Sequence, residues 1–452
     1  MFKKVEMWVL YLVIFISILF AISFGILVRQ ELVGKTKLGW ISKTALIIAE
    51  IPKNTRMIFR NATSVRDRFP NLDGFDGQPN SKESYLLLSR YDGDLKAGVV
   101  ELVDLTTFEV LHTWNPDIDK FNSMVEQVDD FKYLSRDRNN GRYMLKHPYL
   151  TKDNGLFFGG DTSLKKIDAC SELVFQYKED LQHHSIEADI EGNLWTHLYL
   201  YPQSLPAKFV GRDHPRSGDG FMDDAILKIS SDGEVLFKKS ISQILIDNGL
   251  EYLLFAHGNL YENDPIHSND IQPVNFDGEY WKKGDIFISV RNQSMILLYR
   301  PETNQIIWKL AEPFFHQHDV DILDDHRISI FNNNSKNVYG DINIVDGNSE
   351  VVIHDFKTGQ FSSYLADSLA DYNMNTITQG RSEILPNGDL FIEETNTART
   401  LYFNADGSLR WTHYNRASNK IVSRINWSRI LYTNEDIEIV NNFLINKGTC
   451  NE

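Results

Sequence analysis

The sequence predicts an all-β fold, a six-bladed β-propeller, with a transmembrane helix before it and a short helix after it. From about residue 84 to residue 414, short β-type runs alternate with turn residues, with almost no convincing helical period. The runs group into units of roughly 35 to 50 residues with about four strands each, as in the blades of a propeller. The pattern His-x-x-(Asp/Glu)-apolar recurs in three units, at His184, His267 and His318.

The six expected blades follow one another along the chain. They span residues 85–114, 147–177, 184–238, 267–310, 318–365 and 382–411, with insertions near 201–220 and 332–349. Residues 421–431 are expected to close the ring as its last strand, and residues 434–444 have the pattern of a helix, with Thr433 or Asn434 as the N-cap. A seven-bladed ring and a pair of β-sandwiches are the alternatives. Two sandwiches fit the strand lengths, but they do not explain the repeated spacing between the histidines and the following turns.

The N-terminal residues 7–28 carry no charge. A helix over them would span about 33 Å, which is enough to cross the core of a bilayer. A cleavable signal peptide is the alternative, but the apolar stretch is long for that role and Ala21-Ile22-Ser23 is a poor cleavage site. We therefore expect an uncleaved single-pass anchor, with the remaining chain on the periplasmic or extracytoplasmic side. The expected domains are the anchor at 1–28, a lead segment at 29–83, the propeller at 84–431 and a tail at 432–452. In the lead segment, residues 42–51 fit either a helix or a strand.

Composition excludes several classes of function. The formal net charge of −16 and the pI near 5.3 argue against a nucleic-acid partner. The chain has no nucleotide-binding loop, no Cys-x-x-Cys, no Gly-x-Ser-x-Gly and no EF-hand spacing, so no cofactor is predicted. Two cysteines, Cys170 and Cys450, are too few for a disulfide-stapled fold, and we expect them not to pair. The sequence does not determine the oligomeric state.

The three repeated histidines are the first candidate site residues. The innermost strands of a propeller line its channel, so His184, His267 and His318 are expected to converge there from separate blades. Asn269 lies two residues beyond His267, shares its strand face and is a candidate donor to a ligand. His183 is expected to point away from the channel, although a one-residue shift in register would exchange it with His184. The acids of the pattern are expected to serve blade packing rather than to pair with these histidines.

Arg291 adds a positive charge to the predicted channel. It ends a strand in the same blade as His267, where its guanidinium can bind a tetrahedral oxyanion with two N–H groups. Histidines with one arginine in an acidic protein favour a small oxyanion such as sulfate or phosphate. A three-histidine zinc or copper site is the competing interpretation. It depends wholly on convergence, because the sequence has no close His-x-His or His-x₃-His pair among these residues, and no metal ligand is assigned.

The ordered set of channel residues resembles the bacterial arylsulfotransferases that work without a nucleotide sulfate donor. The resemblance covers about residues 84–431. It is carried by His183-His184-Ser185, His267-Ser268-Asn269-Asp270, Ser289-Val290-Arg291-Asn292-Gln293-Ser294 and Gln317-His318-Asp319, with Pro386-Asn387-Gly388 and Trp427-Ser428-Arg429 as weaker matches. The known members also carry an N-terminal β domain and a close pair of cysteines near the site, and the sequence shows neither feature.

The resemblance implies a six-bladed propeller that moves a sulfuryl group from an aryl sulfate to a phenol through a sulfated histidine. It implies that His318 is the nucleophile, that His184 and His267 support it, and that Arg291 binds the sulfate. Asn269 is carried over as a substrate contact, with His183 as the alternative to its neighbour. The implied partners are a small aryl sulfate and a phenolic or other hydroxyl acceptor, with the membrane bound through residues 7–28. A non-enzymatic propeller that binds a surface glycan or a protein partner is the alternative function.

Overall fold

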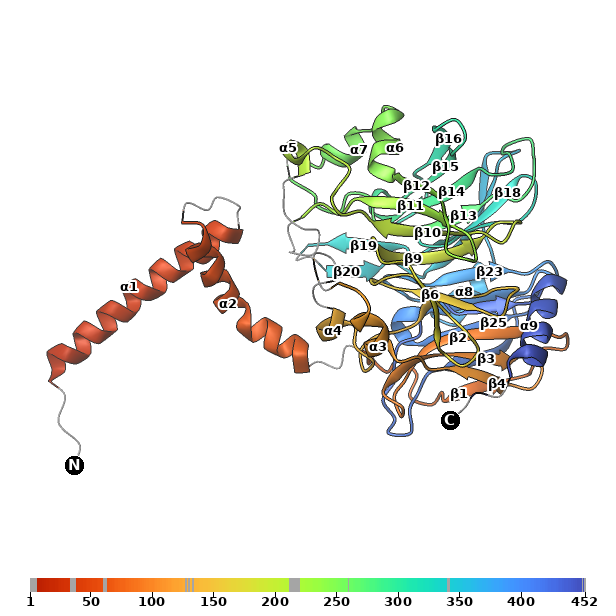
Figure 1. The fold of residues 1–452 in the computed structure, drawn as a ribbon, viewed down its shortest axis with the longest axis horizontal. Helices are drawn as coiled ribbons and strands as arrows, with labels where there is room; N and C mark the ends of the chain where they lie inside the picture. Colours follow the sequence, from red (N-terminus) through yellow and green to blue (C-terminus); the bar gives the residue numbers. More distant parts are fainter. Residues whose placement is uncertain are drawn as a thin grey trace. The chain divides into compact units, whose positions relative to one another are not determined.

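The computed structural model describes residues 6–32, 38–59, 63–126, 128, 131, 134–210, 220–258, 260–339, 342–448 and 450. The chain divides into two compact units, Met1–Ala62 and Thr63–Glu452. The first unit contains the helices α1 (Met7–Leu32) and α2 (Trp40–Phe59), which are the red and orange helices of Figure 1. The segment that the sequence left open between helix and strand therefore lies in a helix.

Helix α1 has the properties of a membrane-spanning helix. Its segment Met7–Glu31 has a mean hydropathy of 2.7, and none of its most apolar window is buried in the protein. A helix of this length can cross the hydrocarbon core of a bilayer. This finding supports membrane anchoring by the N-terminus, as the sequence predicts.

The second unit is a six-bladed β-propeller, which confirms the predicted fold. Blade 1 contains β2 (Tyr85–Asp92), β3 (Ala97–Asp104), β4 (Glu109–Trp114) and the late strand β27 (Arg429–Leu431). Blade 2 contains β5 (Lys146–Leu150), β6 (Leu156–Gly159), β7 (Lys165–Ile167) and β8 (Leu173–Gln176). Blade 3 contains β9 (Leu181–Ala188), β10 (Leu194–Tyr199), β11 (Asp224–Ile229) and β12 (Val235–Ser240). Blade 4 contains β13 (Ser268–Pro273), β14 (Ile286–Val290), β15 (Met295–Arg300) and β16 (Gln305–Leu310). Blade 5 contains β17 (Val320–Ile322), β18 (Arg327–Asn332), β21 (Glu350–Asp355) and β22 (Gln360–Ser363). Blade 6 contains β23 (Arg381–Ile384), β24 (Leu390–Glu394), β25 (Arg399–Phe403) and β26 (Leu409–Tyr414), with β1 (Gly74–Gly77) added at its edge.

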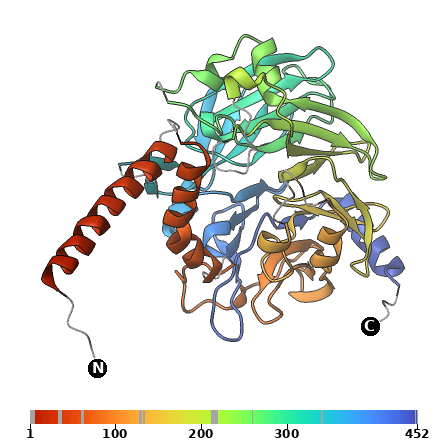
Figure 2. The same ribbon diagram turned by 60° about the vertical axis from the view of Figure 1, so that its left-hand side comes forward.

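The ring closes by joining the two ends of the propeller. The late strand β27 pairs antiparallel with β2, with Leu431 opposite Tyr85, as the sequence predicts for this segment. The blue C-terminal end consequently lies beside the orange first blade in Figure 2. Helix α9 (Asn434–Asn446) follows, and a capping box between Thr433 and Asp436 begins it. The predicted C-terminal helix and its N-cap are confirmed.

Short helices and one hairpin are inserted between the strands. They are α3 (Ile118–Ser123), α4 (Leu134–Asp137), α5 (Ala207–Val210), α6 (Ile241–Asp247), α7 (Tyr252–Phe255), α8 (Ala366–Asp371) and the hairpin of β19 (Ser335–Val338) and β20 (Ile342–Val345). The hairpin lies in the insertion predicted at 332–349. Residues 211–219 of the other predicted insertion lie outside the described residues. The helices were not expected, because elements of one or two turns are too short to produce a helical period.

Cys170 and Cys450 form a disulfide, so the expectation that they do not pair is wrong. Cys170 lies in the turn between β7 and β8, and its Cα is 5.3 Å from that of Cys450. The sequence separation of 280 residues conceals this proximity. Ring closure returns the chain end to the first blades, where Phe443 of α9 packs in one apolar cluster with residues of blades 1 and 2.

Replacing Cys170 with serine is expected to lower the free energy of unfolding by about 2 to 4 kcal/mol, because the bridge closes a long loop in the unfolded chain. Urea unfolding of the propeller unit, with and without reductant, measures this effect. The reduced wild-type protein should match the variant, and the variant should not respond to reductant. Equal urea midpoints for the oxidised protein and the variant would contradict a stabilising bridge.

Candidate functional site

The innermost strands of neighbouring blades are irregular where they carry the predicted site residues. In β9 the pairing with β10 passes from His183 opposite His197 to Ile186 opposite Thr196, which leaves His184 out of the ladder. In β13 the pairing with β14 omits Asn269 in the same way. Such bulges turn a side chain out of the regular alternation and are frequent beside active sites.

The backbone at two of these histidines is strained. His184 and His267 have positive φ angles of 57° and 47°. A left-handed conformation costs a residue other than glycine about 1 kcal/mol or more, and it persists only where the surrounding structure imposes it. The strain explains why a simple strand alternation does not predict where these side chains point.

The three repeated histidines converge, as the sequence predicts. The ring centroid of His184 lies 5.0 Å from that of His267 and 6.4 Å from that of His318. These residues come from β9, from the residue before β13 and from the segment before β17, so three consecutive blades contribute. His184 and His267 are half-buried, whereas only 1% of His318 is exposed.

The hydrogen bonds of His318 define its tautomer. Its Nε2 accepts a hydrogen bond of 2.8 Å from the backbone N–H of Gln379, so the ring proton is on Nδ1. That proton is donated to Oδ1 of Asn333 at 2.6 Å, with the carbonyl oxygen of His316 at 3.2 Å. Burial, followed by the charge of Arg291, holds the pKa of His318 well below its ordinary value. His318 is therefore a neutral imidazole with its lone pair on Nε2.

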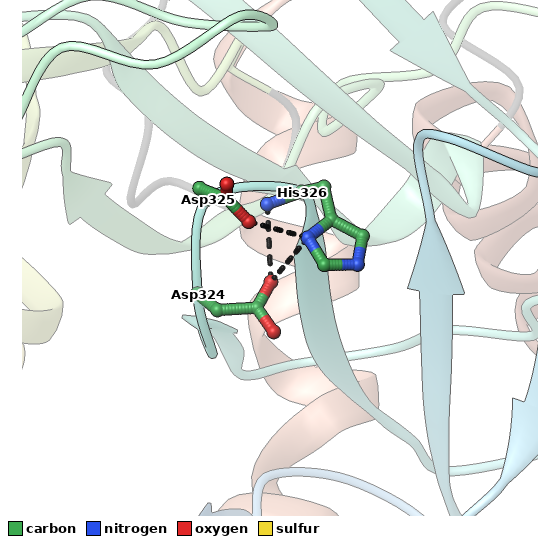
Figure 3. Close-up of side chains that lie close together, drawn as sticks. All are labelled: Asp324, Asp325 and His326. Carbon is green, nitrogen blue, oxygen red and sulfur yellow. Dashed lines mark hydrogen bonds and ion pairs between the residues drawn. The ribbon is translucent and has the colours of Figure 1, made fainter.

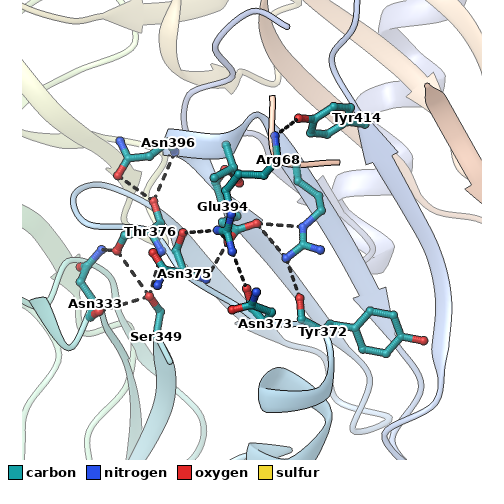
Figure 4. A network of polar contacts seen from close by, with 12 residues as sticks. Arg68, Asn333, Ser349, Tyr372, Asn373, Asn375, Thr376, Glu394, Asn396 and Tyr414 are labelled. Carbon is teal, nitrogen blue, oxygen red and sulfur yellow. Dashed lines mark hydrogen bonds and ion pairs between the residues drawn. The ribbon is translucent and has the colours of Figure 1, made fainter. Parts of the chain in front are cut away.

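Asn333 is itself held by a polar network. Its amide nitrogen donates to the carbonyl oxygens of Thr376 and Gln379, at 2.9 and 2.7 Å, which directs its oxygen towards His318. Figure 4 shows Asn333 at one end of this network, beside Ser349 and Thr376. The network includes Asn375, Glu394 and Arg68. Asn333 was not predicted from the sequence, although it lies in the Asn-Asn-Asn-Ser run at 332–335.

His267 is paired with a carboxylate that was not predicted from the sequence either. Its Nδ1 lies 2.6 Å from Oδ2 of Asp264, three residues earlier in the chain. Burial opposes protonation of the ring, but the negative charge and the hydrogen bond of Asp264 outweigh it, so the pKa of His267 is raised. The pair favours the imidazolium form of His267, beside histidines whose neutral form is favoured. Two acids of the repeated pattern have other partners. Glu187 forms an ion pair with Arg429, and Asp270 accepts a hydrogen bond from the backbone N–H of Val320.

Arg291 is the second cation of the site. It begins the 3₁₀ turn η3 (Arg291–Gln293) at the end of β14, and its Nη1 donates to Oδ1 of Asn292 at 2.7 Å. Its Nε is buried without a hydrogen-bond partner, and no ion pair joins Arg291 to a carboxylate among the described residues. A guanidinium with unused N–H groups in a half-buried position is suited to bind an anion.

Asn269 and His183 are close in sequence to the converging histidines, and their side chains are buried. Asn269 is fully buried, and its side-chain nitrogen donates to the carbonyl oxygen of Gln317 at 3.3 Å. His183 is also fully buried and stacks on Tyr199, with ring centroids 3.8 Å apart. His184 is thus the partly exposed member of the adjacent pair. His147 is buried against Trp427, with ring centroids 4.6 Å apart.

The described residues contain one group with three metal-type ligand atoms within 4.8 Å of one another, and it is not in the channel. It consists of Asp324, Asp325 and His326 in a surface turn (Figure 3). Two cations already neutralise these acids, because Arg327 pairs with Asp324 and Lys357 lies 3.7 Å from Asp325. The channel histidines do not form such a group, so their geometry adds nothing to the three-histidine metal interpretation.

Comparisons with known proteins agree with the geometry. A sequence model of the arylsulfotransferase (ASST) family matches residues 147–416, more than half of the chain. No curated protein matches the sequence. Among solved structures, a protein of unknown function from Bacteroides caccae matches with 12% identity and a TM-score of 0.45, over 76% of this chain and 98% of that one. The WD40 β-propeller domain of Doa1 matches with 12% identity and a TM-score of 0.37, over 83% and 97%. At these values the structural similarities carry no functional argument. The sequence match includes the three channel histidines and Arg291, and the chain belongs to the arylsulfotransferase family.

Proposed function

We propose that this protein is a membrane-anchored aryl-sulfate sulfotransferase that works through a sulfated His318 and needs no cofactor. Family membership supports a sulfotransferase that acts on small molecules. The observation that carries the finer proposal is the charge pattern of the channel. A neutral His318 with its lone pair on Nε2 lies within the electrostatic influence of two cations, Arg291 and the His267 imidazolium.

In the first half-reaction, Arg291 and His267 bind the sulfate oxygens of the donor. Nε2 of His318 attacks the sulfur, the bond from sulfur to the aryl oxygen breaks, and the phenolate leaves. Sulfuryl transfer resembles phosphoryl transfer in its loose transition state, so positioning and cationic stabilisation of the oxygens dominate the rate. The hydrogen bond from Gln379 to Nε2 has to open before the attack. The Nδ1–H bond to Asn333 persists and stabilises the positive charge of the sulfated ring.

In the second half-reaction, the acceptor hydroxyl attacks the same sulfur and the bond from sulfur to Nε2 breaks. The hydroxyl proton has to leave as the new bond forms. His184 is the proposed base, because burial, followed by the charges of His183 and His267, holds its pKa well below the ordinary value and keeps it neutral. Because one site serves donor and acceptor in turn, the kinetics are expected to be ping-pong.

The proposed location is the extracytoplasmic side of a membrane, with the activity in residues 84–431. Helix α1 is long and apolar enough to be the anchor. The disulfide between Cys170 and Cys450 supports the orientation, because such bonds persist in oxidising compartments and are rare in the cytosol. Both lines of support are independent of the chemistry of the channel.

The intact mass of the protein after incubation with 4-nitrophenyl sulfate tests the proposed mechanism. One sulfuryl group adds about 80 Da, and the adduct should appear together with a burst of 4-nitrophenolate of equal stoichiometry. Fragmentation should place the group on His318, and addition of a phenol should remove it. A folded protein that releases no phenolate and gains no mass would overturn the proposal for this class of donor.

Donor binding is expected to weaken as pH rises. The charged groups that face His267 are Asp264, Arg291 and Asp224, and Asp264 raises its pKa. The imidazolium is therefore present below this raised pKa and is lost as pH rises through it, so KM for the donor should rise there by about 10-fold, the value of one charged hydrogen bond. With Asp264→Asn, burial dominates and the rise should occur at lower pH. KM is measured for the wild type, for this variant and for Asp325→Asn, an exposed control beside His326. A KM that does not vary with pH would contradict the role of His267.

A further inference from the structure

A buried carboxylate and two adjacent histidines form a chain that ends in the channel. Oδ1 of Asp224 lies 3.2 Å from Nε2 of His183, and Nδ1 of His183 lies 2.6 Å from Nδ1 of His184. Asp224 and His183 are both fully buried, whereas His184 is half-buried. The contact between Asp224 and Nε2 of His183 is within ion-pair distance, although its geometry is not that of a hydrogen bond.

The tautomers along this chain depend on one another. If Asp224 is ionised, Nε2 of His183 carries a proton and faces the carboxylate. Nδ1 of His183 then has a lone pair, so the short contact between the two Nδ1 atoms requires the proton to be on Nδ1 of His184. The lone pair of His184 is consequently on Nε2, the nitrogen that is free to face the channel.

We propose that Asp224, His183 and His184 form a proton relay that makes His184 the acid and the base of the transfer reaction, with Asp224 and His183 as positioning residues. The inference rests on the proposed function and deepens it. At the start of the cycle the relay holds one proton more than in the arrangement just described. In this starting state His183 is an imidazolium between Asp224 and His184. His184 is neutral, but its proton is on Nε2 and its lone pair is on Nδ1.

Each half-reaction moves this proton in one direction. When the phenolate leaves the donor, it takes the proton from Nε2 of His184, and the shared proton passes from Nδ1 of His183 to Nδ1 of His184. When the acceptor attacks the sulfated His318, its hydroxyl proton goes to Nε2 of His184 and the shared proton returns to His183. Protons balance over the cycle, and no external acid or base is consumed. The positive charge is on His183, beside the Asp224 carboxylate, at the start and at the end of the cycle, and both histidines are neutral between the two half-reactions.

Features of the surroundings fit a relay better than a packing role. Oδ1 of Asp224 accepts from the backbone N–H of Ser268 at 3.2 Å and from its hydroxyl at 2.9 Å, which keeps the carboxylate in place. Its Oδ2 is buried without a partner, a costly arrangement that a purely structural aspartate would avoid. His183 is fixed by stacking on Tyr199. The relay also explains how His184 can exchange protons although burial disfavours its charged form.

The dependence of the rate on the leaving group tests the relay. Sulfates of phenols with different pKa values are compared as donors for the wild type and for Asp224→Asn. 4-Nitrophenolate leaves without a proton, so its release should change less than about 3-fold, whereas phenyl sulfate needs the acid and should react about 100-fold more slowly. The plot of log rate against leaving-group pKa should therefore become steeper. His183→Phe retains an aromatic ring against Tyr199 and should steepen the plot in the same way. It provides the test if Asp224→Asn does not fold.

Asp223→Asn is the matched control. Asp223 is the neighbouring buried aspartate, and its carboxylate accepts from Ser240 and from the backbone of Ser204 outside the relay. This variant should change thermal stability without changing the slope of the plot. A rate loss in Asp224→Asn that is equal for all donors, or absent for all, would overturn the relay. A different result would contradict the proposed function itself: a wild-type protein that transfers no sulfuryl group from any donor.

Discussion

Replacing His318 with alanine is expected to abolish sulfuryl transfer, with a loss of at least about 10⁴-fold in kcat, as is typical when a nucleophile is removed. The imidazole supplies the atom that forms the bond to sulfur, and its Nδ1 proton is held by Asn333, which leaves the lone pair on Nε2. Turnover of 4-nitrophenyl sulfate with a phenol acceptor and the mass of the protein after incubation are the measurements. The variant should show neither turnover nor the adduct of about 80 Da.

His326→Ala is the control for this prediction. His326 lies eight residues further along the chain, in the exposed turn with Asp324 and Asp325, and should be replaceable without loss of activity. Because His318 is buried, circular dichroism and thermal melting have to show that its variant folds. A folded His318→Ala protein that still turns over at more than about a tenth of the wild-type rate would refute the assignment of the nucleophile. Transfer would then have to proceed directly between donor and acceptor, which kinetics without a ping-pong pattern would reveal.

The sequence predicted the ring, because the signals involved are local and repeated. Alternation in each strand, turn residues between strands and the recurring histidine pattern are all visible within about ten residues. The closing strand was predicted for a related reason. The β-type segment at 421–431 follows the last unit directly, and the structure pairs Leu431 with Tyr85. The capped helix α9 was predicted because its N-cap and its acidic first turn are adjacent in sequence.

The parts that the sequence did not predict depend on contacts between distant residues. Cys170 and Cys450 approach each other only because the ring closes. Asn333 and Gln379 hold His318 from outside its own inner strand, and no short-range pattern connects them. Asp224 lies on the third strand of its blade and reaches His183 across the sheet. Asp264 is the exception, since it lies only three residues before His267. Its pairing with His267 was not predicted, because the repeated pattern contains only the acid that follows each histidine.

Strand geometry also gave an incomplete account of the side chains in the channel. The rule that alternate residues share a face predicted that Asn269 lies in the channel with His267. In the structure Asn269 lies at a bulge and is buried, as His318 is, and the left-handed φ of His267 interrupts the alternation just before it. The same departure at His184 separates this residue from the buried His183. A bulge at a functional site is recognised in a structure more readily than in a sequence, because it changes the direction of a side chain without changing the local composition.

Replacing Arg291 with methionine is expected to lower kcat/KM for the donor by about 10²- to 10³-fold, the loss typical for removal of one group that stabilises charge in a transition state. Lysine should restore less than about a tenth of this loss, because an ammonium cannot bind two sulfate oxygens through a planar fork. The stability of the protein should not fall. The buried Nε of Arg291 has no partner, so its removal relieves an unsatisfied group rather than breaking an ion pair.

Arg300 provides the opposite case in the same blade, because its guanidinium binds both oxygens of Asp285 at 2.7 Å. Arg300→Met should therefore lower the melting temperature and leave kcat/KM unchanged, while Arg291→Met should lower kcat/KM and leave the melting temperature unchanged or raised. Donor kinetics and thermal melting of both variants are the measurements. A buried charge that is left unpaired so that it can bind a ligand lowers the stability of the protein. A charge that is paired within the protein does not. Loss of stability without loss of activity in Arg291→Met would assign this arginine to the fold and remove it from the site.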